Sequence, residues 1–410
     1  MKVLYVTGAC LFNNTSANMS HNAYVQGLLE NGADLDIIMA SDSWGESDSK
    51  FKKYPDARYF IYNSVSVIDR IRLKGRGIIR SQVEISLKVA NVSGKEAVSQ
   101  RPSVSLKSKV RSCLKRLFYA CFKQDPIYPL QKTWLKKAIK FKSENEYDLV
   151  VSNSSPAASH RLVSDLLERK RIKARRWVQI WEDPWYYDLY GLKSEAILEE
   201  EHYLLRRAQE ILYVSPLTIH YQKRYFPDCA EKMKVIPLPA FNFGCRVPVD
   251  IKGPVAFGYF GDYNFHVRNL KPFYEALNMS GMPGYIYGDS DMPLPSSDTI
   301  VVSGRVTLDV LEGVQDKTSV LVHLSNLKGG QIPGKIYHYS ATSKPILFIL
   351  DGSDDEKLLL RNYFSKFDRY VFCENNSEEI LNAMKAIVKR FQWQKPVDDF
   401  SPKAVVKMFV

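Results

Sequence analysis

The segment around residue 330 has the residue types and spacing of an anion-binding loop. An apolar run at 319–324 precedes Gly329 and Gly330, and Pro333 stands two residues before Lys335. Glycines let phosphate oxygens approach the backbone, and proline suits the first position of a helix, whose free N–H groups and positive dipole end attract anions. A lysine in that first turn is unfavourable for the helix itself, because its charge opposes the positive dipole end. Its presence there therefore favours a bound anion that neutralises both. An exposed lysine at a plain loop-to-helix junction remains the alternative interpretation.

The elements that must position this loop alternate between strands and helices. Strand patterns lie at 2–8, 35–40, 148–153, 177–181, 211–215 and 235–237 in the first half, with helical patterns from residue 20 and at 157–170 and 195–208. The second half repeats the alternation, with strands at 255–260, 284–287, 299–303, 319–324, 345–350 and 370–372 and helices at 270–277, 308–313, 333–341, 354–363 and 377–390. Parallel strands joined in this way end at one edge of the sheet, where ligands bind. The sequence predicts doubly wound α/β domains at 1–240 and 254–395, with a segment 396–410 that packs back on the first domain.

Length and composition agree with two globular domains. The chain has 410 residues, 45% of them hydrophobic, which supplies two cores and excludes a largely disordered protein. The six cysteines are scattered, without a CxxC pair or a histidine at ligand spacing, so we expect neither structural zinc nor a disulfide framework. No strongly apolar run approaches the roughly 20 residues that span a bilayer. We therefore expect a cytoplasmic protein.

The net charge of +12 is concentrated in one segment. Between Arg70 and Lys142, 19 lysines and arginines stand against three acids. Residues 111–123 place apolar side chains on about half of a helix and cations on the rest, as interfacial amphipathic helices do. This pattern predicts a basic, membrane-facing insert at about 65–142 that contacts an anionic membrane surface; a solvated face is the alternative. Nucleic-acid binding is not expected, because no reader motif is present.

Residues 331–346 resemble the donor-site segment of GT-B glycosyltransferases. The run reads Gln331-Ile-Pro-Gly-Lys-Ile-Tyr-His-Tyr-Ser-Ala-Thr-Ser-Lys-Pro-Ile346. It looks like a bacterial surface-polysaccharide branch of family 4, in which Pro-[Ser/Gly]-Lys-x-x-Glu-Tyr precedes a Lys-Pro-[Ile/Val] strand. Segments 2–8, 208–215 and 258–268 agree in the same order, and Trp181-Glu-Asp-Pro-Trp185 resembles an Arg-Asp-Pro-Trp segment of that branch. The resemblance implies a GT-B fold, in which two Rossmann-like doubly wound domains face a cleft.

In that family the second domain binds a nucleotide-diphosphate sugar. The resemblance implies that Arg268 and Lys335 neutralise the diphosphate as the sugar leaves, and that Gly261 lets its loop approach the phosphates. Taken alone, Arg268 could equally be a surface charge before a helix. The donor-binding residues implied are Gly261, Arg268, Gly330, Gln331, Ile332, Pro333, Gly334, Lys335 and His338. The donor is a substrate, and no cofactor or metal is implied.

Two positions depart from the family pattern. Gly330 and His338 stand where the family usually has glutamates, the later of which hydrogen-bonds the nucleotide ribose. His338 could still bond a ribose hydroxyl, or it could be a packed side chain.

Two residues of the first domain are expected to face the cleft. His21, at the start of the helix expected from residue 20, could contact the transferred sugar or accept a proton, or it could be an ordinary polar residue of a helix N-terminus. Asp183, after the strand at 177–181, could hold an acceptor hydroxyl, or it could form a turn before Pro184. The candidate catalytic set is therefore His21, Asp183, Arg268 and Lys335.

The leading hypothesis is a hexosyltransferase-type glycosyltransferase of bacterial polysaccharide assembly. It would move a sugar, with retention of configuration, from a nucleotide-diphosphate sugar to a lipid-linked or other glycan acceptor at the inner face of the cytoplasmic membrane. Retention needs no strong protein base, because the leaving phosphate can take the proton. A catalytically silent partner subunit of the same fold and a sugar-nucleotide epimerase or hydrolase are the alternatives.

Overall fold

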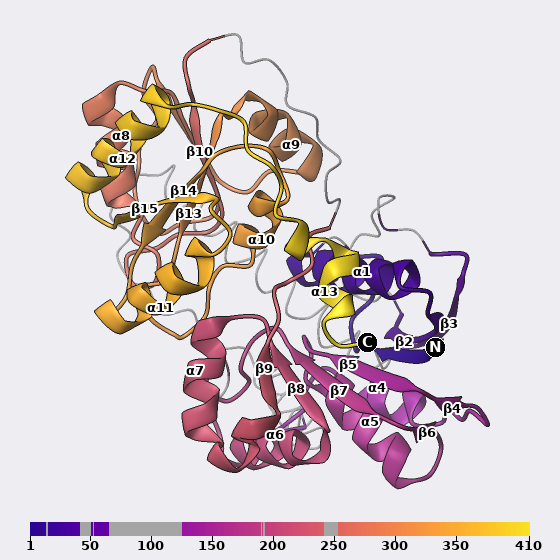
Figure 1. The fold of residues 1–410 in the computed structure, drawn as a ribbon. Coiled ribbons are helices and arrows are strands. Elements are labelled where there is room, and N and C mark those ends of the chain that lie inside the picture. Colours follow the sequence, from indigo (N-terminus) through magenta and orange to yellow (C-terminus); the bar gives the residue numbers. More distant parts are fainter. Residues whose placement is uncertain are drawn as a thin grey trace, which may run out of the picture.

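Two parallel β-sheets organise the chain into two lobes (Figure 1). The computed structural model describes residues 1–13, 15–41, 51, 53–64, 125–189, 191, 193–241 and 253–410. The amphipathic helix predicted at 111–123 and most of the predicted basic insert lie outside these residues. Both sheets are covered by helices, so the predicted GT-B architecture of two Rossmann-like α/β domains is confirmed.

The first sheet has seven parallel strands in the order β3-β2-β1-β5-β7-β8-β9. Its elements are β1 (Lys2–Val6), α1 (Ser16–Glu30), β2 (Asp34–Ala40), β3 (Ala57–Tyr62), α4 (Lys132–Ala138), β5 (Leu149–Asn153), α5 (Ala158–Glu168), β7 (Trp177–Trp181), α6 (Glu195–Arg207), β8 (Glu210–Tyr213), α7 (Pro216–Tyr225), the 3-10 helix η1 (Pro227–Lys232) and β9 (Met233–Val235). A separate small pair joins β4 (Glu146–Tyr147) to β6 (Lys173–Ala174). Strands β5, β7 and β8 are buried throughout, because helices cover parallel sheets on both faces.

The second sheet has six parallel strands in the order β12-β11-β10-β13-β14-β15. Its elements are β10 (Phe257–Phe260), α8 (Lys271–Ser280), β11 (Gly284–Tyr287), β12 (Ile300–Ser303), α9 (Leu308–Lys317), β13 (Val320–Leu324), α10 (Lys335–Ser340), β14 (Ile346–Leu350), α11 (Asp354–Ser365), β15 (Tyr370–Glu374) and α12 (Ser377–Lys389). The strand order reverses between β10 and β13, as it does between β1 and β5 in the first sheet. In open α/β sheets, ligands bind at the carboxyl ends of the strands where the strand order reverses in this way.

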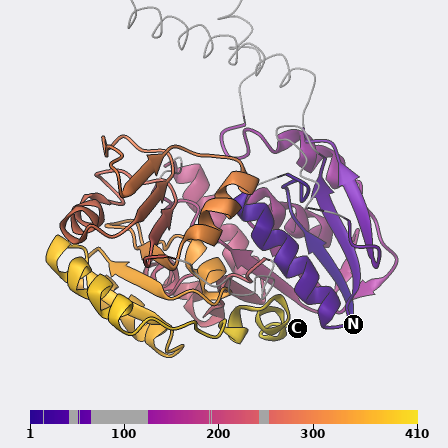
Figure 2. The ribbon, with the colours of Figure 1, turned by 90° about the horizontal axis from the view of Figure 1, so that it is seen from above.

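The C-terminal segment returns to the first lobe. After η2 (Asp398–Phe400), helix α13 (Pro402–Lys407) packs against α1, and both views show the two helices side by side (Figures 1 and 2). A Cβ at Gly27 would lie only 2.2 Å from the backbone oxygen of Pro402. Glycine in α1 therefore permits this close approach.

Two helix starts differ from the sequence prediction by more than one residue. Helix α1 begins at Ser16, because the Thr15 side chain accepts a hydrogen bond from the Asn18 N–H and caps it. His21 consequently lies inside the helix rather than at its start, so that expectation was wrong. Helix α10 begins at Lys335 and not at Pro333. Among the helices described, none combines the length and apolarity needed to cross a bilayer.

Candidate functional site

At the carboxyl edge of the second sheet, the loops after β10 and β11 approach one another closely. A Cβ at Gly288, after β11, would lie 1.9 Å from the carbonyl oxygen of Gly261, after β10. The Asp289 N–H donates to Oδ1 of Asp262 at 3.0 Å, which ties the same two loops together. Gly261 is half-buried, and a Cβ there would lie 3.5 Å from the Tyr259 hydroxyl. The strand ends are thus fixed before any ligand binds.

Lys335 brings a desolvated positive charge to this edge. It is the first residue of α10, it is half-buried, and its Nζ donates to the carbonyl oxygen of Phe260 at the end of β10. Burial lowers the pKa of Lys335 to about 8; the Asp262 carboxylate opposes that shift, and the charges of Arg268 and Arg305 add to it. Clustered cations disfavour one another, so the site gains stability when a dianion neutralises them.

Arg268 lies in the same group and is held by two hydrogen bonds. Its Nε donates to Oδ1 of Asn326 at 2.7 Å, and its Nη1 donates to the carbonyl oxygen of Asp262 at 3.0 Å. Asn326 follows β13, and its Nδ2 donates to the carbonyl oxygen of Gln331 at 3.1 Å. The structure therefore brings together Arg268 and Lys335, which lie 67 positions apart in the sequence.

Arg305 and Asp262 are functional candidates that the sequence did not reveal. Arg305 follows β12 and pairs with Asp262, Nε to Oδ1, at 3.0 Å, and with Oδ2 of Asp289 at 3.3 Å. These residues come from the ends of three neighbouring strands, so only the strand order reveals that they meet. In the sequence, each of them is only a polar residue that follows a strand-like run.

The loop at 327–334 departs from the helix-terminus site that the sequence suggested. Gly334 caps α10 without a side-chain hydrogen bond, and the helix has only six residues, so its dipole is a minor contribution. Gly330 instead adopts a left-handed backbone with φ of 64°, and a Cβ there would lie 2.7 Å from Cδ2 of Tyr221. Ile332 and Pro333 are half-buried within this loop. Side-chain cations, more than a helix end, therefore supply the positive charge at this edge of the sheet.

His338 lies on the helix that Lys335 opens. It is half-buried, and its Nδ1 is buried without a hydrogen-bond partner among the described residues. Burial and the neighbouring Lys335 lower its pKa to about 4, so the imidazole is neutral near pH 7. A neutral ring with an unused nitrogen can donate or accept one ligand hydrogen bond.

A carboxylate of the first lobe reaches this loop. Asp183 follows β7 and accepts a hydrogen bond at Oδ1 from Nε2 of Gln331. Desolvation raises the pKa of Asp183 to about 6, and the bond from Gln331 opposes that rise. The preceding Glu182, which the sequence analysis passed over, is desolvated further, and the charge of Asp183 adds to a strongly raised pKa. The lobes thus meet at a pair of adjacent acids.

His21 lies beneath these acids in a buried polar network. The residue is fully buried, and its Nδ1 lies 2.7 Å from the hydroxyl of Tyr5. That hydroxyl accepts a bond from Nδ2 of Asn153 at 3.0 Å, and Nδ2 also lies 3.4 Å from Oε1 of Glu182. Burial lowers the pKa of His21 to about 4. His21 is therefore neutral and is linked to the acid pair through Tyr5 and Asn153.

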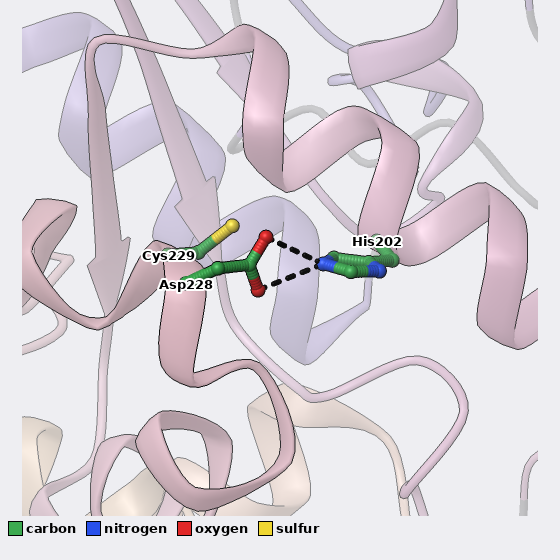
Figure 3. Close-up of side chains that lie close together, drawn as sticks. All are labelled: His202, Asp228 and Cys229. Atoms are coloured by element: carbon green, nitrogen blue, oxygen red, sulfur yellow. Dashed lines mark hydrogen bonds and ion pairs between the residues drawn. The ribbon is translucent and has the colours of Figure 1, made fainter.

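One set of potential metal ligands comes together in the described part of the first lobe. Nε2 of His202 lies 2.9 Å from both carboxylate oxygens of Asp228, next to the buried Cys229 (Figure 3), and the three ligand atoms lie within 4.8 Å of one another. Arg206 contacts Nδ1 of His202 at 3.3 Å and lies 3.9 Å from Asp228. Because a guanidinium already supplies positive charge here, an ion-pair network explains the cluster. The expectation that the protein needs no metal stays a prediction.

Comparison with solved structures shows shared architecture. Sucrose-phosphate synthase from Thermosynechococcus elongatus is 12% identical, with a TM-score of 0.52, and the match covers 100% of this chain and 95% of that one. HepE of Anabaena, in complex with UDP and glucose, is 11% identical over 100% and 95% of the chains, with a TM-score of 0.51. A glycosyltransferase from Rickettsia africae is 10% identical over 99% and 91%, with a TM-score of 0.50. No family model and no curated protein matches the sequence. At such low identities, the likeness shows the GT-B fold alone.

Proposed function

We propose that this chain is a glycosyltransferase that takes a sugar from a nucleotide-diphosphate sugar. One observation carries the proposal. The half-buried side chains of Lys335 and Arg268 come together at the carboxyl edge of the sheet where the strand order reverses, between β10 and β13. The fold match to HepE, whose solved structure contains UDP and glucose, supports a uridine diphosphate donor.

The chemistry follows from the charge that develops at the leaving group. As the bond between sugar and diphosphate breaks, negative charge grows on the phosphate oxygens, and the fixed cations Lys335 and Arg268 stabilise it. Removal of one such preorganised donor typically costs about 3–4 kcal/mol of transition-state stabilisation. These side chains would neutralise the diphosphate without a divalent metal. With retention of configuration, the departing phosphate would accept the proton of the acceptor hydroxyl, and Asp183 would orient that hydroxyl.

Calorimetry with nucleoside diphosphates tests the donor site directly. We expect UDP to bind the wild-type chain and the control Lys385→Met, whose lysine is exposed on α12, and Lys335→Met to bind it at least about 100-fold more weakly. Absence of binding for every common nucleoside diphosphate would exclude a donor site here.

One observation favours an alternative function, and experiments on the same protein separate both alternatives from the transferase. The family's paired glutamates are replaced by Gly330 and His338, which suits a silent partner subunit. Donor-dependent sugar transfer by the isolated chain would exclude that alternative, whereas donor turnover without an acceptor would indicate an epimerase or hydrolase.

The acceptor and location are proposals of the same kind. The basic residues between Arg70 and Lys142 support a lipid-linked glycan acceptor in bacterial polysaccharide assembly, at the inner face of the cytoplasmic membrane. Flotation with vesicles tests the membrane contact: we expect binding to phosphatidylglycerol vesicles and none to phosphatidylcholine vesicles.

A further inference from the structure

A tyrosine-lined cavity lies between the lobes beside the loop at 327–334, the candidate donor loop. Its volume is about 330 Å³, at the lower end of the range for small-molecule sites. The walls come from both lobes: Pro184, Tyr187, Thr218, Tyr221, Gln222 and Tyr225 on one side, and Lys328, Gly329, Gly330, Ser353 and Glu356 on the other. Pro184 adjoins Asp183, and Gly330 adjoins Gln331, so the cavity shares its wall with the site described above.

The aromatic wall is a set of nearly parallel rings. Tyr187 and Tyr225 stack with an interplanar angle of 13°, and Tyr221 lies at 17° to Tyr225. Tyr225 is 39% exposed, so part of this wall is accessible to a ligand. Flat aromatic faces suit the C–H surface of a pyranose ring.

The polar lining of the cavity includes two acceptors, Gln222 and Glu356, together with the cation Lys328. Gln222 is only 1% exposed, and its Oε1 is buried and has no hydrogen-bond partner among the described residues. Glu356 presents a carboxylate, whose Oε1 accepts from the Tyr221 hydroxyl at 2.9 Å. A buried acceptor without a donor is costly, and ligand hydroxyls would satisfy it. Lys328 and Glu356 carry opposite charges, so the lining has no net charge and suits a neutral ligand.

We infer that this cavity is a subsite for a neutral pyranose ring of the glycan acceptor. The inference rests on the proposed transferase function and adds the class of acceptor that the site recognises. The tyrosine faces would pack on the sugar, while Gln222 and Glu356 would accept hydrogen bonds from its hydroxyls. The position beside Gly330 would place the bound ring next to the donor loop.

Saturation-transfer NMR on the full chain tests the subsite, with methyl glycosides of glucose, galactose, rhamnose and N-acetylglucosamine as probes. We expect transfer to the ring C–H protons of at least one probe. Tyr225→Ala and Gln222→Leu should each weaken its Kd by about tenfold. Leu358→Ala, an exposed change on α11 outside the cavity, serves as the control and should leave that Kd unchanged.

Parallel calorimetry with UDP separates this inference from the proposed function. The cavity variants should retain wild-type affinity for UDP, because neither replaced side chain lies among the cations of the donor site. Binding of UDP without any glycoside signal, or a signal that both cavity variants retain, would overturn the subsite and leave the donor site standing. Glycoside binding without any nucleoside diphosphate binding would keep the sugar site and refute the transferase.

Discussion

Gln331 donates a hydrogen bond to Asp183, which joins the loop after β13 to the loop after β7. Two further bonds cross between the lobes nearby: Thr218 Oγ1 to the Gly330 carbonyl oxygen at 3.0 Å, and the Tyr337 hydroxyl to the Val214 carbonyl oxygen at 2.6 Å. The candidate donor loop is therefore oriented by the first lobe as well as by its own sheet.

Protonation of Asp183 should lower kcat/KM at acidic pH, which gives the pH profile an acidic limb. Its pKa is raised to about 6 by desolvation, so the carboxylate that we propose to orient the acceptor hydroxyl is lost as pH falls through about 6. We expect kcat/KM to fall about tenfold per pH unit below that value. Asp183→Asn should lower kcat/KM and remove this limb, and a limb that persists in the variant would contradict the assignment.

Deprotonation of Lys335 should weaken donor binding at alkaline pH. Its pKa is about 8 in the free protein, and a bound diphosphate favours the charged form, so UDP binding takes up a proton above pH 8. We expect the affinity for UDP to be constant below pH 7.5 and to decline above pH 8. Calorimetry in buffers of different ionisation enthalpy measures the proton uptake. Lys335→Met, if it binds UDP measurably, should show none at this pH.

Gly330→Glu should destabilise the protein rather than restore the glutamate of the family. The site has φ of 64°, and Cβ would meet the Tyr221 ring at 2.7 Å. We expect a loss of about 1–3 kcal/mol in the free energy of unfolding, measured with urea. Adding Tyr221→Ala should recover only the steric part, because the backbone strain remains. Full wild-type stability of the single variant would refute this packing.

Gly27→Ala should loosen the C-terminal helix. The added methyl would lie 2.2 Å from the Pro402 oxygen, so α13 must shift, and we expect about 1–3 kcal/mol of destabilisation. Gly313→Ala is the matched control, since Gly313 is also helical and nothing lies within 4 Å of its added Cβ. That control should raise stability by about 0.5–1 kcal/mol. Thermal unfolding of both variants measures the contrast.

The order of strands and helices could be predicted from the sequence because buried parallel strands are short apolar runs. Strand β7 occupies the predicted 177–181 without change, and β14 and β11 differ by at most one residue. Helix ends were less predictable. The cap at Thr15 moved the start of α1 from residue 20 to Ser16, and this shift placed His21 inside the helix.

Local patterns in the sequence determined that Lys335, Arg268 and Asp183 are polar residues at strand or loop ends, together with the alternation that makes a two-domain α/β fold. Only the tertiary structure decided which of them meet. Strand order brings Arg305 to Asp262, and contact between the lobes brings Gln331 to Asp183 and the Tyr221 ring against Gly330. Such contacts depend on the packing of distant segments, which no local periodicity encodes. Desolvation, which lowers the pKa of Lys335 and raises that of Asp183, likewise arises only after those segments pack.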